Sequence, residues 1–478
     1  MQASAKAQSL NVIVTLTRTF VFTLFISPEN FGLIALSLTF TGFISILKDF
    51  GYTTYIIQQD ISEHELIAIN TRALLYGIIS FLVVCIIAVP ISNVYHRVEL
   101  LWILPITGIQ FILNAFTMVP LALMRKNMEF NKVGIIDVWS NVISVLTGLL
   151  LLLITRSYWV ILLTSVLFYV VQMLLTFKYS SWKHQFSNPV HNKLTKSGAT
   201  FGLQLTAFNV LTFLSVNLDS MIIGKIAGIP VLGNYTKSYE FGNSNIDKLV
   251  KRPIQQVYFS DLSGKDVNEK CRLFFQYLFL LASVVLVIVG PALIFTELLV
   301  ENLLNSKWRP LIGMLPPFFL CTLLWMTMSL ADQLLIASNN LKRYLLLGVV
   351  KSVVGSVAIV ISSFWGAQAM AYSFLIYHLV LFVPFCYYVF TGINVGEAKV
   401  KAMIKDTCII TGTASVAILI PFILLQQNLI GISLATVIFL ANYIVLHAFV
   451  WSQIAHYAPF KVFFWNLVAF RITKPKVL

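Results

Sequence analysis

The chain has 478 residues, of which 58% are hydrophobic and only 11% are charged. A soluble domain carries about 25% charged residues, so this composition excludes an ordinary soluble protein. Apolar runs of about 20 residues, enough to cross a membrane, recur from end to end. They indicate an all-α, polytopic membrane protein. The formal net charge of +14 raises the question of nucleic-acid binding, which the placement of the charges answers below.

The apolar runs predict about fourteen transmembrane helices. The first run has no A-x-A-like cleavage site after it, so it is interpreted as the first span and not as a signal peptide. In chain order the predicted spans are 9–26, 33–57, 66–90, 100–123, 133–155, 158–178, 200–223, 232–257, 273–296, 311–337, 344–363, 367–391, 403–424 and 429–451.

The segment 217–233 places an acid, Asp219, and a base, Lys225, in or beside a predicted membrane span. An ionisable side chain at the centre of a membrane costs at least about 2.5–3.5 kcal/mol on insertion scales. Such residues therefore usually face a wet cavity or pathway. We expect both to line a cavity of this kind.

The same segment repeats an earlier one that begins at Leu16. In register, Arg18 aligns with Asp219 and Gly32 aligns with Gly233. Two copies of one membrane unit, each with an ionisable residue at the same depth, predict a two-lobed transporter with a polar centre.

The repeat continues along the chain, because a Leu-Pro pair opens a later helix in each half, at 104–105 and at 315–316. Each half holds an even number of helices, so the two homologous six-helix bundles share one orientation. The predicted organisation is an N-terminal six-helix lobe at 1–180, a cytoplasmic linker at 181–196, a C-terminal six-helix lobe at 197–391, two additional transmembrane helices at 402–451 and a basic cytoplasmic tail at 452–478.

The basic residues gather in alternate loops, which is the bias that marks the cytoplasmic side of a membrane protein. The rich set includes Arg125, Lys183, Lys265, Lys342 and Lys401. The poor set holds Arg97, Arg156, Lys307 and Arg309. We therefore expect both termini in the cytoplasm. The basic excess is explained by topology and by attraction to anionic lipid headgroups, and not by nucleic acid.

The sequence offers no recognisable catalytic or metal-binding motif. Its five cysteines lack C-x-x-C spacing, and its histidines lack H-E-x-x-H spacing. It contains neither G-x-x-x-x-G-K-[ST] nor G-x-S-x-G. We expect no catalytic residues, no metal and no cofactor, and hence a protein that is not an enzyme.

The predicted helix 232–257 is unusually polar for a membrane span. At about 100° per residue its polar side chains fall in one wedge, opposite an apolar face. An amphipathic helix on the membrane surface and a solvated cytoplasmic helix are the alternatives. Removing this span would break the charge alternation downstream, so a bundle helix beside a water-filled cavity is favoured. The wedge holds Lys237, Glu240, Asn243, Ser244, Asp247, Lys248, Lys251 and Gln255, and Lys237, Glu240 and Lys248 are candidate substrate-binding residues.

Arg18 shares a helical face with Asn11 and Thr15 and is a candidate cation in the cavity wall. The alternative is an arginine that reaches to the membrane interface. For Asp219 the alternative to a role in coupling is a structural ion pair, with Arg18 as its partner. Secondary candidates are Lys48, Arg72, Asp332 and Lys351, and for the first two a charge at a helix end is the favoured interpretation.

Three segments resemble bacterial polysaccharide flippases of the multidrug/oligosaccharidyl-lipid/polysaccharide exporter superfamily. They are ISPENFGLIALSLTF at 26–40, MRKNMEFNKVGIIDV at 124–138 and NLDSMIIGKIAGIPVLGNYTKSYEF at 217–241. The third is the most specific. The chain departs from the family at Leu24, where an arginine is frequent, and at Ser220, where a base is frequent. A detailed phosphate-binding map is therefore not transferred.

The resemblance implies a flippase that moves an undecaprenyl-pyrophosphate-linked oligosaccharide across the bacterial cytoplasmic membrane by alternating access. The product would serve capsule, exopolysaccharide or O-antigen synthesis. Implied partners are membrane lipids, a polysaccharide polymerase and a chain-length regulator. A pyrophosphate and sugar head cannot cross hydrocarbon unaided, because its polar groups would be unsatisfied there. Arginine and lysine would hold the anionic head.

Three alternatives stay open. A multidrug or cation antiporter typically needs acids in its cavity, whereas bases such as Arg18, Lys225 and Lys237 outnumber the acids here. A membrane-embedded enzyme acting on lipid-linked sugars needs a catalytic outer loop, and outer loops such as 27–30 are short. A non-transporting scaffold within a capsule assembly complex is the third.

Overall fold

The computed structural model describes residues 2–49, 52–58, 61–182, 217–304, 306–393 and 395–424, together with residues 185 and 213. Within these ranges all regular elements are helical, which confirms the all-α prediction. Nine of the helices in these ranges are long and apolar enough to cross a membrane. The predicted span 429–451 and the basic tail lie outside the described residues, and so do most of the span 200–223 and of the linker 181–196.

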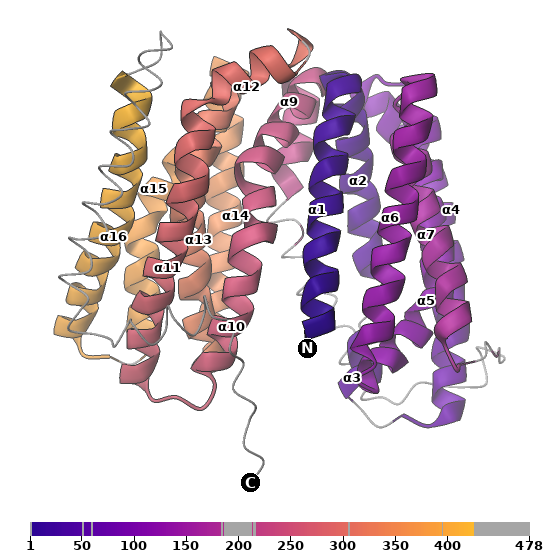
Figure 1. The fold of residues 1–478 in the computed structure, drawn as a ribbon, viewed down its shortest axis with the longest axis horizontal. Helices are drawn as coiled ribbons and strands as arrows, with labels where there is room; N and C mark the ends of the chain where they lie inside the picture. The colour runs from indigo at the N-terminus through magenta and orange to yellow at the C-terminus, as the bar shows by residue number, and fades with distance from the viewer. Residues whose placement is uncertain are drawn as a thin grey trace. The chain divides into compact units, whose positions relative to one another are not determined.

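The chain divides into two compact units, and Figure 1 shows their helices in the order of the chain. The first unit comprises residues 1–237, 300–311 and 348–370. Its helices before the linker are α1 (Gln2–Phe25), α2 (Pro28–Asp49), α3 (Tyr52–Gln58), α4 (Glu63–Tyr95), α5 (Leu100–Lys126), α6 (Phe130–Thr155) and α7 (Trp159–Tyr179).

Local sequence features set the ends of several helices in the first unit. Pro28 opens α2, a position at which its missing N–H costs nothing. Ser62 caps α4 by accepting a hydrogen bond from the Glu65 backbone N–H, and α4 ends at His96 in the left-handed conformation. α4 packs along α5, α6 packs along α7, and α1 packs against α6. Buried apolar residues such as Ile69 and Val119 fill the contact between α4 and α5.

The second unit comprises residues 238–299, 312–347 and 371–478. Fully buried aromatic residues, among them Phe274, Phe318 and Phe390, form its core. The helices that contribute to it, some of them shared with the first unit, are α10 (Arg252–Leu262), α11 (Val267–Ile294), α12 (Thr296–Leu303), α13 (Leu311–Ala337), α14 (Leu341–Ser362), α15 (Ala367–Gly392) and α16 (Glu397–Leu424), and short 3₁₀ turns, η3 (Ser306–Trp308) and η4 (Ser363–Trp365), lie in the first unit.

The predicted polar span 232–257 is a real helix, but it is not uniform. It starts as α9 (Ile229–Tyr239), passes through two π-helical turns, η1 (Glu240–Ser244) and η2 (Asp247–Lys251), and continues as α10. A π turn inserts an extra residue and re-phases the helix, and such turns are frequent at functional sites. A wheel drawn at a constant angle per residue therefore does not describe this span beyond Tyr239.

Candidate functional site

The N-terminal turns of α2 and α9, called here the first and the second turn, lie at matching positions of the sequence repeat and contact each other in the first unit. A Cβ added to Gly32 would lie 2.1 Å from the carbonyl oxygen of Ile229. A Cβ added to Gly233 would lie 1.8 Å from the carbonyl oxygen of Pro28. The two contacts are reciprocal, because the same sequence offset relates Gly32 to Gly233 and Pro28 to Ile229. Glycine is required at both places for this close backbone approach, and the reciprocity supports the repeat.

Residues at the C-terminal end of α4 bind residues in or beside both turns. Arg97 forms an ion pair with Glu29 of the first turn, with 2.6 Å between Nη1 and Oε1. Lys225, in the helical segment just before the second turn, donates from Nζ to the carbonyl oxygen of Val94 at 2.6 Å. A lysine at the C-terminal end of a helix satisfies a carbonyl that has no partner within the helix. Lys225, predicted to line the cavity, is therefore an exposed residue that links the segment before the second turn to α4.

Lys237 lies on α9 and is 5% exposed. Its ammonium group stands 4.0 Å from the ring centroid of Phe31 on α2. The Phe31 ring in turn packs against the fully buried Trp308 of η3, with 5.6 Å between centroids. A cation over an aromatic face is attracted by the ring quadrupole, more strongly when it is desolvated. The structure thus places Lys237 in an aromatic contact between segments far apart in the chain.

Asp219 has hydrogen-bond partners from its own helix and from α9. One carboxylate oxygen accepts from the Ser220 backbone N–H at 2.7 Å, and the other accepts from the Tyr235 hydroxyl at 3.2 Å. Tyr235 is itself buried. Through the Tyr235 hydroxyl, Asp219 therefore links the helical segment before α9 to α9 itself.

Arg18 is half-buried on α1. Its predicted companions, Asn11 and Thr15, both accept hydrogen bonds from the side-chain amide of Asn141 on α6. This stripe of α1 accordingly faces a neighbouring helix of the first unit. Arg18, one turn further on, has interaction partners of its own.

The secondary candidates are dispersed. Arg72 is half-buried on α4 beside Tyr52, whose ring stacks on that of Tyr76 with 6.2 Å between centroids. Lys351 is half-buried on α14. The side chain of Lys48, on α2, falls outside the described residues.

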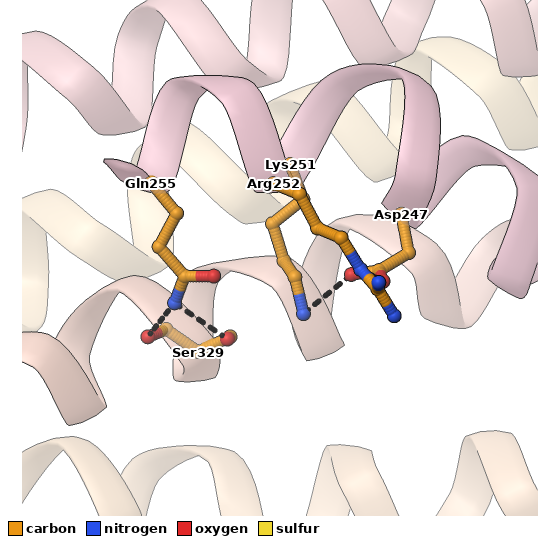
Figure 2. A network of polar contacts seen from close by, with 5 residues as sticks. All are labelled: Asp247, Lys251, Arg252, Gln255 and Ser329. Carbon is orange, nitrogen blue, oxygen red and sulfur yellow. Dashed lines mark hydrogen bonds and ion pairs between the residues drawn. The ribbon is translucent and has the colours of Figure 1, made fainter. Parts of the chain in front are cut away.

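The second unit contains a network of polar contacts on η2 and α10, shown in Figure 2. Asp247 forms ion pairs with two cations: its Oδ1 lies 2.5 Å from Lys251 Nζ, and its Oδ2 accepts from Arg252 Nε at 2.8 Å. Further along, Gln255 donates from Nε2 to the backbone oxygen and to the hydroxyl of Ser329 on α13, both at 3.1 Å. The network therefore joins the π turn to α13.

The deeper part of this network is closed to solvent. The side chains of Asp247 and Lys251 are 8% and 10% exposed. The Lys251 ammonium stands 3.8 Å from the ring centroid of Trp325, and it interacts electrostatically with Asp332, an 8% exposed residue of α13. A buried charge is tolerated only when it is paired and hydrogen-bonded, and these contacts provide that pairing.

The structure gathers only some of the predicted site residues. Asp332, a secondary candidate, joins the network through Lys251. Glu240 opens η1 and is half-buried, as is Lys248 within η2. Arg252 is missing from the predicted polar wedge, because a wheel at a constant 100° per residue places it just outside that wedge and ignores the π turns. Across the described ranges, no group of three or more His, Cys, Asp and Glu residues is placed to hold a metal ion.

The long apolar helices in the described ranges define a class: a multi-pass helical membrane protein. The chain belongs to the polysaccharide biosynthesis protein family, whose model matches residues 21–313. This confirms the family resemblance of the segments 26–40, 124–138 and 217–241, all of which lie within the match.

Individual proteins extend the comparison. The chain is 26% identical over 321 residues to the lipopolysaccharide biosynthesis protein WzxC of Escherichia coli K12, an alignment that covers 65% of this chain and 64% of WzxC, slightly less than two thirds of it. A structure of the lipid II flippase MurJ in an inward closed conformation matches with a TM-score of 0.74 at 12% identity, covering 95% of this chain and all of that one.

An inward-facing multidrug-resistance transporter of the MATE family in the MOP superfamily matches with a TM-score of 0.60 at 14% identity, covering 83% of this chain and 96% of that chain. At these identities both structural matches establish the fold alone.

Proposed function

We propose that this protein is a flippase that moves undecaprenyl-pyrophosphate-linked oligosaccharide units across the bacterial cytoplasmic membrane. The observation that carries the proposal is membership of the polysaccharide biosynthesis protein family over residues 21–313. The similarity to WzxC, named for lipopolysaccharide biosynthesis, supports the same pathway class. The fold shared with a lipid II flippase supports a substrate with a polyprenyl tail and a polar head.

The buried charges suit such a cargo. Lys237, Asp247 and Lys251 are buried in a chain whose long helices in the described ranges are mostly apolar. A membrane protein retains ionisable side chains at depth mainly where they face a polar path or one another. The head would travel past such groups while the polyprenyl tail stays in lipid, which spares the head the cost of entering hydrocarbon.

Alternating access requires a closure that forms and breaks. The reciprocal glycine turns, with the Glu29–Arg97 ion pair and the Lys225–Val94 hydrogen bond, provide such a closure at the end of the first unit predicted to lie outside. Opening toward the outside would separate Gly32 from Ile229 and Gly233 from Pro28. These contacts are few and polar at their rim, so their exchange for water is inexpensive.

The proposal includes a location and a role without catalysis. Both termini would lie in the cytoplasm, and the protein would sit in the inner membrane. It would work beside a polysaccharide polymerase and a chain-length regulator, and it would leave the covalent structure of the lipid-linked oligosaccharide unchanged.

A strain that lacks its own flippase and accumulates lipid-linked repeat units tests the proposal. Expression of the wild-type chain should restore surface polysaccharide, measured by immunoblot of whole cells. The lipid-linked intermediate should fall in parallel and be chemically unaltered by mass spectrometry. Wild-type protein that inserts in the membrane but restores no polysaccharide, while raising resistance to cationic drugs, would favour the antiporter alternative.

A further inference from the structure

One carboxylate, Asp247, contacts cations four and five residues further along the same helix. In an α-helix, at about 100° per residue, position i+5 lies about 140° around the axis from position i. In a π turn, with about 4.4 residues per turn, positions i+4 and i+5 lie about 33° and 49° to either side of it. The π turn η2 therefore lets Asp247 reach both Lys251 and Arg252.

The two cations are held in opposite environments. The Lys251 side chain is 10% exposed and lies against the Trp325 ring, whereas the Arg252 side chain is 60% exposed. Lys251 is further compensated by the electrostatic interaction with Asp332. The buried charges are therefore matched inside the unit, and Arg252 is the member of the network that faces outward.

Asp247 engages Arg252 through Nε. It is the one acceptor that the described part of the chain gives this guanidinium, and the Arg252 side chain is 60% exposed, so the Nη donors are available to a ligand. A guanidinium presents five N–H donors in a fixed plane, so holding Nε sets the direction of the others. Downstream, the hydrogen bonds of Gln255 to Ser329 fix the next turn of the helix (Figure 2). The backbone that carries Arg252 is thus anchored on both sides.

We propose that Arg252 is a phosphate-binding residue for the pyrophosphate head of the lipid-linked substrate, and that Asp247 is its positioning residue. The inference rests on the proposed function and adds the group that receives the head in the second unit. Two parallel N–H donors of one arginine match two oxygens of a phosphate, and such charge-assisted pairs are the strong ones.

The position of Lys248 and the predicted topology fit this role. Lys248 stands four residues before Arg252 in the same continuous helix, so a second basic residue lies one turn away along the chain. On the predicted topology, the helix 232–257 runs inward and Arg252 lies near its cytoplasmic end. A substrate made on the cytoplasmic side would meet this residue early.

The test measures binding and export together. Purified wild-type protein in phosphatidylcholine nanodiscs is titrated with undecaprenyl pyrophosphate, with undecaprenol as the lipid that lacks the head and inorganic pyrophosphate as a competitor. R252Q should weaken binding of undecaprenyl pyrophosphate at least about tenfold, because it loses charge-assisted hydrogen bonds. The matched control is R272Q, which removes another exposed arginine that is paired to one carboxylate, Glu269, and should bind like wild type.

The outcomes separate the inference from the function. If wild type exports polysaccharide and R252Q binds and exports equally well, Arg252 is not a phosphate-binding residue, while the proposed function stands. If undecaprenol binds as tightly as the pyrophosphate lipid, the site recognises the tail, and the inference is wrong. If wild type neither binds nor exports, the function and the inference fail together.

Two more variants distinguish a loss of binding from a loss of folding. R252K keeps the charge but loses the planar fork, so its affinity should fall while its unfolding midpoint stays at the wild-type value; wild-type affinity in R252K would contradict the inference. D247N/K251M removes the buried pair and releases Arg252. It should weaken the affinity for undecaprenyl pyrophosphate without a matching loss in the unfolding midpoint, which a purely structural role for Asp247 would not produce.

Discussion

Glycine at positions 32 and 233 shows how a single hydrogen in place of a side chain determines packing. Both residues lie in helices, where glycine is about 1 kcal/mol less favourable than alanine. Glycine is nevertheless required at both positions, because the carbonyl oxygens of Ile229 and Pro28 occupy the space that a Cβ would fill. Elsewhere the balance is reversed: a Cβ added to Gly348, in α14, meets nothing within 4 Å.

Replacing Gly32 or Gly233 by alanine should force the two turns apart, because contacts of 2.1 and 1.8 Å cannot be absorbed without backbone movement. We expect export to fall at least about tenfold and a destabilisation of about 1–3 kcal/mol, typical of overpacking. The measurements are surface polysaccharide and the unfolding midpoint in detergent. G348A is the matched control and should be neutral or stabilising. Normal export in both G32A and G233A would show that the close contact is dispensable.

Asp219 lends itself to a second substitution at this scale. Its carboxylate accepts from the Tyr235 hydroxyl and from Ser220. Asp219→Asn keeps the shape and removes the charge, so it should reduce export while membrane insertion stays intact, if the charge takes part in coupling. Y235F removes the partner alone and serves as the comparison. A loss of protein from the membrane in D219N would indicate a structural carboxylate, and full export would remove it from the mechanism.

Individual residues show where sequence reasoning reached its limit. The alignment of Gly32 with Gly233 came from the repeat alone, and the structure places both in one reciprocal contact. The environment of Lys237 did not follow from the repeat. The Phe31 ring beside it, and Trp308 behind that ring, are distant in sequence, and no local sequence pattern predicts that they come into contact.

At the scale of the element, the helix from Ile229 to Leu262 combines a predictable part with an unpredictable one. Its polarity and length are evident from the sequence, and the structure contains the helix. The π turns are not evident, because residues around them make contacts with distant segments, such as that of Lys251 with the Trp325 ring, which the local sequence does not reveal. A wheel at constant angle groups Lys248 with Lys251, whereas the structure leaves the first half-buried and buries the second.

The buried pair in η2 predicts a non-additive response to mutation. D247N leaves the Lys251 ammonium without its nearest carboxylate and should lower the free energy of unfolding by about 3–5 kcal/mol. D247N/K251M removes both charges and should recover most of that loss, since a well-packed neutral pair replaces a desolvated one. The unfolding midpoint of purified protein measures both. Additive losses in the double variant would mean that the pair does not act as a unit.

At the scale of the whole molecule, composition alone predicted the helical membrane class, and the nine apolar helices in the described ranges confirm it. The charge pattern also indicated which loops share one side of the membrane. Residues in or beside loops assigned to the same side meet in the first unit, where Glu29 contacts Arg97 and Phe31 contacts Trp308. The placement of the lobe boundary at 181–196 stays a prediction, because most of that linker lies outside the described residues.

Single-cysteine labelling tests the orientation of the whole chain. In a variant without native cysteines, cysteine at Lys126, Lys265 or Lys401 should not react with a membrane-impermeant maleimide applied to intact cells. Cysteine at Arg156 or Lys307 should react, because both side chains are exposed and lie in the loops poor in Lys and Arg. Permeabilised cells provide the control for reactivity at the first three positions. Labelling of Lys265 or Lys401 from outside would reverse the orientation and place Arg252 near the outer end of its helix. The early capture of the substrate head by Arg252 would then be excluded, even if Arg252 binds phosphate.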